Sequence, residues 1–176
     1  ENPETTSFYL AENGEPVITY QSAFIRPLAS TVKILIAIEY AMQVEENKIQ
    51  KDQKIPLDDL NRFYLKNTDG GAHEAWLDAM QQVDGIQNNE VTLHDVAKGM
   101  ITYSSNANTD YLINLLGVDA INKRKTELGL TQHEEVYPIV SALFIPDAIR
   151  KDGMSEKELI NALQKMSMED YRTLAQ

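Results

Sequence analysis

Residues 27–47 of this chain have the sequence PLASTVKILIAIEYAMQVEEN. Proline disfavours helix at the residue before it, so we expect a helix to begin beyond Pro27. From Ser30 onward the stretch is apolar on nearly every face of a helix, and it is too short to cross a bilayer. Such a helix belongs in the middle of a globular core. We therefore expect residues 30–47 to form the central helix of the protein.

The start of this expected helix carries two polar side chains, Ser30 and Lys33, that lie about one turn apart on one face. A serine hydroxyl becomes a good nucleophile when a base takes its proton, and a lysine amine can be that base when burial lowers its pKa. Backbone N–H groups at a helix N-terminus favour developing negative charge. The pair is therefore a candidate for nucleophilic catalysis. A helix-capping serine followed by a solvated lysine explains the same residues.

A second polar cluster, YSSNAN at residues 103–108, lies between two expected helices. Taken alone, its hydroxyl and amide groups are explained as caps of the helix that follows. Its chemical interest depends on whether the chain brings it to Ser30 and Lys33, which a sequence does not show.

A β-hairpin is expected near the N-terminus. Asn13-Gly14 separates two β-leaning runs, residues 7–10 and 16–20, and this dipeptide favours a tight hairpin turn. An isolated hairpin is marginally stable and usually joins a larger sheet. We expect the completing strands to come from a segment beyond residue 176 or from a second chain.

The remaining elements are expected to be mostly helical. Two capping boxes, Thr92 with Asp95 and Ser155 with Glu158, mark helix starts. Helices are expected over residues 72–83, 93–102, 108–116, 119–128, 155–166 and 167–174, with a short helix or turn over 57–65 and an irregular extended segment over 136–145.

The composition excludes several classes of protein. The chain has 176 residues, no cysteine and a net charge of −11. It therefore has no disulfide, thiol nucleophile or cysteine-based metal site, and its acidic surface disfavours nucleic-acid binding. His73, His94 and His133 lack metal-ligand spacing, and no glycine-rich phosphate motif occurs. We expect no metal and no cofactor.

Two motifs together resemble a known family. Residues 27–37, PLASTVKILIA, resemble the nucleophile helix of the class A β-lactamases and their serine-hydrolase relatives. Residues 100–112, MITYSSNANTDYL, resemble that family's Ser-Asp-Asn motif and the helix after it. The order, spacing and flanks of the motifs agree with the family over residues 8–145. The resemblance implies an α+β fold of the β-lactamase and transpeptidase type, present as the helical lobe and N-terminal hairpin with the other strands missing.

The resemblance also implies roles for individual residues. Ser30 would be the acylated nucleophile, with its backbone N–H as one oxyanion donor. Lys33 would be its general base or proton relay. Ser104 would pass a proton toward the leaving group, and Asn106 would bind both the substrate amide and Lys33. The expected partner is a small-molecule or peptide amide, such as a β-lactam or a peptidoglycan peptide. The expected location is outside the bacterial cytoplasm, at the cell surface, in the periplasm or beyond.

Two features depart from the family. Ser105 replaces the aspartate of the second motif. The third motif, Lys-Thr/Ser-Gly on a strand, is absent. Lys151-Asp152-Gly153 matches it loosely, but this tripeptide lies in a charged segment without strand character. The chain therefore resembles a truncated member, a single incomplete domain over residues 1–176 with its helical core at about 30–135.

A base for the deacylating water is not evident either. Glu134 and Glu135 lie in the right region, but their surroundings do not match the family's loop, and they are most simply solvated. This favours a relative of the family over a true β-lactamase. Two alternatives stay open: a non-catalytic or truncated member that acts as a binding or structural module, and a helical interaction domain in which both motifs are only caps. In that last case Ser30 and Ser104 would lie more than about 8 Å apart, beyond one bridging water.

Overall fold

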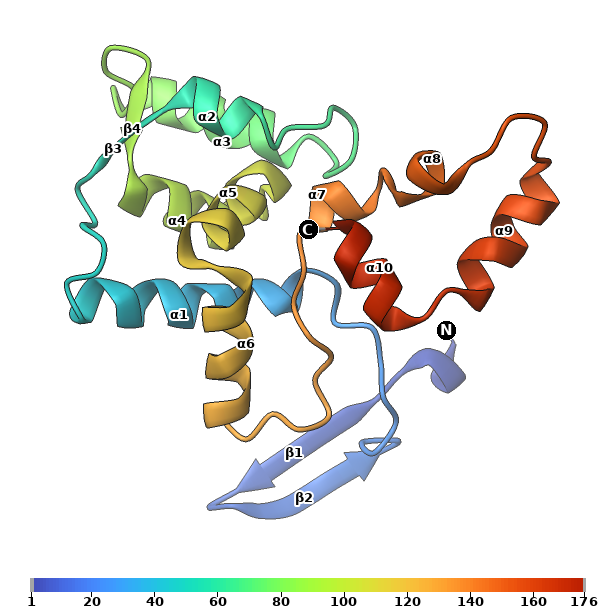
Figure 1. Ribbon diagram of the computed structural model, residues 1–176. Coiled ribbons are helices and arrows are strands. Elements are labelled where there is room, and N and C mark those ends of the chain that lie inside the picture. The colour runs from blue at the N-terminus through green and yellow to red at the C-terminus, as the bar shows by residue number, and fades with distance from the viewer. Residues whose placement is uncertain (1, 176) are drawn as a thin grey trace.

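The α+β class expected from the sequence is confirmed by a computed structural model, which describes residues 2–175 (Figure 1). Short strands form two separate antiparallel pairs, β1 with β2 and β3 with β4, and helices make up most of the rest. The elements in chain order are η1 (Pro3–Thr5), β1 (Phe8–Glu12), β2 (Glu15–Tyr20), η2 (Ala29–Val32), α1 (Lys33–Glu45), β3 (Lys54–Pro56), α2 (Leu57–Asn61), α3 (Ala72–Gln82), β4 (Glu90–Thr92), α4 (Leu93–Tyr103), α5 (Asn106–Leu116), α6 (Val118–Glu127), α7 (Ile139–Ala142), α8 (Ile145–Ile149), α9 (Glu156–Lys165) and α10 (Met168–Ala175).

The N-terminal hairpin forms as expected. Strands β1 and β2 pair antiparallel in a register that places Phe8 opposite Tyr20. Asn13 and Gly14 both have positive φ, 52° and 87°, as the favoured two-residue hairpin turn requires. Every residue of both strands is exposed, and Figure 1 shows the hairpin projecting below the helices. Within residues 2–175 no further strand pairs with it. Completion of this sheet by another segment or chain stays a prediction.

Helix α1 is central, but it is not buried on all sides. Leu35, Ile36 and Tyr40 enter the main apolar core, whereas Ile34 is 57% exposed. The expectation of a helix surrounded by core is therefore wrong for one face. Helices α4, α5 and α6 pack against α1 but leave the face that carries Ile34 uncovered; Figure 1 shows α4 and α5 above α1 and α6 running down from it.

A buried polar network fixes α1 to its neighbours. The Glu39 carboxylate accepts hydrogen bonds from Gln43 Nε2 (2.9 Å) and from Arg124 Nε of α6 (2.9 Å). Gln43 Nε2 also donates to the Leu116 carbonyl oxygen at the end of α5 (3.0 Å). Buried charges need such partners, and these contacts set how α1 lies against α5 and α6.

The remaining helices of the core follow the sequence signals closely. Thr92 and Asp95 form the expected capping box at the start of α4. Gly117, with φ of 87°, ends α5, and Trp76 of α3 is buried. The short β3–β4 ladder was not expected from the sequence; it ties the segment before α2 to the segment before α4.

The C-terminal helices form a second, smaller cluster around Ala142, Ile145 and Ala175. Here the expectation of an irregular extended segment over residues 136–145 is wrong, because α7 and α8 begin within it. The cause is a tertiary cap: the Asp110 carboxylate of α5 accepts from the backbone N–H groups of Ile139 (2.7 Å) and Val140 (2.6 Å). Of the helices in residues 2–175, none has both the length and the apolar character to cross a bilayer.

Candidate active site

Ser30 lies in η2, the single turn that leads into α1, and its side chain is exposed. The preceding residue, Ala29, has a φ of +46°, which costs an L residue on the order of 1 kcal/mol and is typical of sites that need a fixed geometry. The first hydrogen bond of the turn runs from Thr31 N–H to the Leu28 carbonyl oxygen (3.0 Å). Within the described residues the Ser30 backbone N–H has no protein acceptor, so it is free to donate to a ligand.

Lys33 is the first residue of α1, and only 2% of it is exposed. Its Nζ donates to the Ser104 carbonyl oxygen (2.6 Å), to Ser104 Oγ (2.9 Å) and to Asn106 Oδ1 (2.8 Å). An ammonium group has three N–H donors, and here each has an acceptor. The interpretation of Lys33 as a solvated side chain beyond a helix cap is therefore wrong.

The bend between α4 and α5 brings the second polar cluster to this lysine. Ser104 ends α4 in the left-handed region, with a φ of 66°, which turns its side chain and its carbonyl group toward Lys33. Ser104 Oγ and Ser30 Oγ are 2.9 Å apart. This distance contradicts the alternative in which both motifs are only caps, because it is far shorter than that alternative requires.

Burial lowers the pKa of Lys33 to about 8, well below the ordinary value of a lysine amine. The negative charges of Asp69 and Asp110 act in the opposite direction and hold that pKa up. The amine is therefore partly neutral near pH 8, and a neutral amine can accept a proton.

Ser105, the departure from the family's aspartate, does not face Ser30. Its side chain is fully buried and caps α5 by accepting from the Asn108 backbone N–H (3.2 Å). Ser105 Oγ is also 3.0 Å from Nδ1 of His73, a buried residue of α3. Burial lowers the pKa of His73, which favours a neutral ring. The capping explanation of this cluster is thus correct for Ser105, and α5 begins two residues earlier than expected.

Two carboxylates of the site were missed in the sequence. Asp69, in the loop before α3, accepts from the Asn106 backbone N–H (3.3 Å). Asp110, one turn into α5, is buried, and this burial raises its pKa while its backbone hydrogen bonds lower it. Asp69 was detectable only as an acidic residue before a Gly-Gly turn and a helix. Nothing local to Asp110 indicates that it holds another segment.

The two glutamates considered in the sequence lie apart from this arrangement. Glu135 is exposed and forms an ion pair with Arg172 of α10 (2.5 Å), and Glu134 is exposed. Lys151-Asp152-Gly153 lies in the loop between α8 and α9. Within residues 2–175 no group of three or more acidic or histidine side chains could hold a metal ion.

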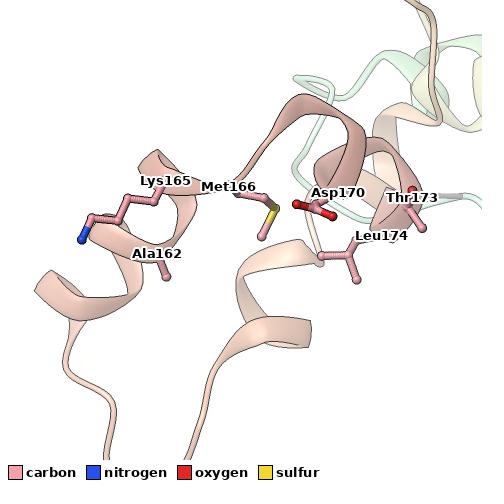
Figure 2. A pocket seen from close by; sticks show the side chains of 6 residues that line it. All are labelled: Ala162, Lys165, Met166, Asp170, Thr173 and Leu174. Carbon is pink, nitrogen blue, oxygen red and sulfur yellow. The ribbon is translucent and has the colours of Figure 1, made fainter.

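Two surface cavities also lie away from Ser30. One, of about 480 Å³, lies between α9 and α10 (Figure 2). Figure 2 shows the Met166 sulfur beside it, with Asp170 on the adjacent helix and the Lys165 amine extending away. The other, of about 400 Å³, is lined from α6, α10 and the segment around Val136. Ser30, which is exposed, lines neither of these two cavities.

Comparison of the sequence with known proteins identifies its family. The chain matches the sequence model of the β-lactamase enzyme family over residues 1–173. Neither the curated proteins nor the solved structures contain a match. A match over nearly the whole chain shows that the protein belongs to the β-lactamase enzyme family, with a general function that is serine hydrolase-like and a fold of the β-lactamase type.

Proposed function

We propose that the protein forms an acyl-enzyme on Ser30 with an amide substrate, either a β-lactam or a peptidoglycan-type peptide. One observation carries the proposal: a continuous hydrogen-bonded chain runs from Ser30 Oγ through Ser104 Oγ to Lys33 Nζ, with 2.9 Å at each step. A nucleophile needs a base within such reach, directly or through one group.

The direction of proton transfer follows from the acceptors around Lys33. Of the three, only Ser104 Oγ also carries a proton that it can donate. When Lys33 is neutral, its two remaining N–H groups serve the Ser104 carbonyl and Asn106 Oδ1, and its lone pair accepts the Ser104 hydroxyl proton. Ser104 Oγ then accepts the proton of Ser30. The relay acts through Ser104, since no direct hydrogen bond joins Ser30 to Lys33 within the described residues.

The chemical step is an acyl transfer. Ser30 Oγ bonds to the carbonyl carbon while its proton passes to Ser104 and the Ser104 proton passes to Lys33, and the carbonyl oxygen becomes an oxyanion. The Ser30 backbone N–H donates to that oxyanion. When the C–N bond breaks, the Lys33 ammonium returns a proton through Ser104 to the leaving nitrogen. The product is an ester on Ser30.

Asn106 has a supporting role in this proposal. Its Oδ1 accepts from Lys33, which fixes the amide plane and leaves Nδ2 without a protein acceptor in the described part of the chain. That N–H group is available to donate to the carbonyl of the substrate's amide side chain. The exported location implied by the resemblance is part of the same proposal.

Turnover of the ester is expected to be slow. Hydrolysis needs a base beside the acyl group, and Glu135 is engaged by Arg172 on the exposed surface. Glu134 is also exposed, with its backbone carbonyl oxygen beside the His133 ring. We therefore expect a long-lived acyl-enzyme.

Labelling with a fluorescent penicillin or a fluorophosphonate tests the proposal directly. The wild type is expected to take one covalent label on Ser30, and Ser30→Ala is expected to lose it because this substitution removes the exposed hydroxyl at the end of the relay. Ser22→Ala, a change at another exposed serine, is the matched control and is expected to label like the wild type. Peptide mapping locates the label, and its persistence over hours measures deacylation. Equal labelling of Ser30→Ala would contradict the proposal.

The labelling rate is expected to depend on pH through Lys33. The reactive form is the one with a neutral Lys33 amine. Because the pKa of Lys33 is about 8, the amine is neutral in about a tenth of the molecules at pH 7 and in about nine tenths at pH 9. The labelling rate should therefore increase about tenfold from pH 7 to pH 9, with its midpoint near 8. A rate independent of pH over this range would show that Lys33 is not the base.

A second candidate function rests on a different observation. Ser30 is exposed, and the two cavities described above are lined by other residues. A non-catalytic member of the family that binds a partner would show the same features. A folded wild type that takes neither label would favour this binding or structural module over the enzyme.

A further inference from the structure

Asp69 lies where two helices begin. Its Oδ1 accepts from the Ala72 backbone N–H (3.1 Å), and its Oδ2 accepts from His73 N–H (3.2 Å) and Asn106 N–H (3.3 Å). These N–H groups belong to the first turns of α3 and α5, and each of these helices has 11 residues. Such N–H groups have no acceptor within their own helix, and the helix dipole favours a negative charge there. One carboxylate therefore joins the starts of both helices.

The residue that Asp69 holds in α5 is part of the Lys33 site. Asn106 is the first residue of α5, and its side chain accepts from Lys33 Nζ (2.8 Å). Asp69 holds the backbone of Asn106 in place. It therefore also sets the position from which the Asn106 side chain reaches Lys33. Asp69 itself has no hydrogen bond to Ser30, Ser104 or the Lys33 amine within the described residues.

The loop before α3 is shaped to present this carboxylate. Gly70 and Gly71 follow Asp69 and have φ of 68° and 85°, a region that L side chains rarely adopt. This turn reverses the backbone so that α3 begins directly over the Asp69 carboxylate. His73 then holds the neighbouring residue of the bend, since its Nδ1 is 3.0 Å from Ser105 Oγ. The start of α3 thus contacts Ser105, and the loop before α3 contacts the next residue, Asn106.

We propose that Asp69 is a positioning residue for acylation of Ser30, which holds Asn106, and through Asn106 the Lys33 amine, in the geometry of the relay. The inference rests on the proposed function and adds to it the loop of residues 67–71 as a structural part of the site.

Asp69 also acts on Lys33 through its charge, which separates this role from a purely structural one. The charged side chains that act on Lys33 are Asp69, from the loop before α3, and Asp110, from α5, and both raise the pKa of Lys33. Asp69→Asn keeps the shape of the side chain and removes its charge. The pKa of Lys33 should then fall, so the pH midpoint of labelling should move to lower pH. The weaker hold on Asn106 should lower the labelling rate on the high-pH plateau about tenfold.

The experiment compares Asp69→Asn, Asp69→Glu and the control Asp78→Asn, which removes an exposed carboxylate from the neighbouring helix α3. Fluorophosphonate labelling rates are measured from pH 6 to 10. Asp69→Glu keeps the charge but displaces it by one methylene, so its plateau should fall while its midpoint stays near that of the wild type. Asp78→Asn should match the wild type in both.

Two measurements need no acylation. NMR titration of the Lys33 side chain should show a lower pKa in Asp69→Asn than in Asp78→Asn, and amide hydrogen exchange at Asn106 should be faster. If the wild type takes no label, the proposed function fails, and these two measurements still decide the role of Asp69. If Asp69→Asn matches Asp78→Asn in Lys33 titration, Asn106 exchange and labelling, the inference is overturned. A lower plateau with unchanged midpoint and unchanged Lys33 titration in Asp69→Asn would also overturn it.

Discussion

The helical core and the N-terminal hairpin contain similar apolar residues and place them in opposite environments. Ile36 of α1 is 0% exposed, whereas Ile18 of β2 is 51% exposed. The hairpin has a regular register and the expected turn, so local structure is satisfied in both regions. The difference lies in what packs against them: α4, α5 and α6 pack against α1, and within residues 2–175 nothing buries either face of the hairpin. Apolar residues in a sequence indicate that a surface favours burial, but they do not show which segment packs against it.

The same contrast applies to polar groups. In the core, Lys33 has three acceptors, and Glu39 has two donors, so each buried charge is compensated. The proposed relay of Ser30, Ser104 and Lys33 therefore lies among compensated polar groups. The hairpin contributes no side chain to the hydrogen bonds of Ser30, Lys33, Ser104 and Asn106. The proposed chemistry should depend on the core and should tolerate change in the hairpin.

The largest expected effect is that of Ile36→Ala in the core. Removing a fully buried isoleucine side chain loses its transfer free energy and leaves a cavity, at a cost of about 3 kcal/mol in the free energy of unfolding. Urea denaturation followed by circular dichroism measures this cost. Since Ile36 lies on the same helix as Lys33, labelling of Ser30 should also weaken as the fold loosens. A loss below about 1 kcal/mol would show that α1 is less well packed than described.

The sequence predicted the parts of the structure that depend on neighbours along the chain. The Asn13-Gly14 turn and the Thr92 capping box are examples, and both are present. Ser30 and Lys33 were identified from their positions on the expected helix, and Ser104 and Asn106 by resemblance; the structure brings all four together, while their catalytic roles remain a proposal.

What the sequence did not predict depends on contacts between distant segments. Asp110 caps α7 across 29 positions, which turned an apparently extended segment into helix. Asp69 reaches Asn106 across 37 positions, and His73 reaches Ser105 across 32. In each case the polar side chain has an ordinary local role in the sequence, and its real partner is fixed only when the helices pack. The exposure of Ile34 on α1 was unpredictable for the same reason, because it depends on which helices pack against α1.

The smallest expected effect is that of Ile18→Ala in the hairpin, the same substitution as in the core. Half of Ile18 is already exposed, so its removal should change the free energy of unfolding by less than about 0.5 kcal/mol and leave labelling of Ser30 unchanged. The same urea denaturation, at two protein concentrations, measures this change in the free energy of unfolding.

A cost of Ile18→Ala close to that of Ile36→Ala would mean that the hairpin is covered in solution. If that cost also increased with protein concentration, the cover would be a second copy of the chain, because only association makes stability depend on concentration. A large cost independent of concentration would instead place the cover within the same chain, and the contrast between the two regions would then be wrong.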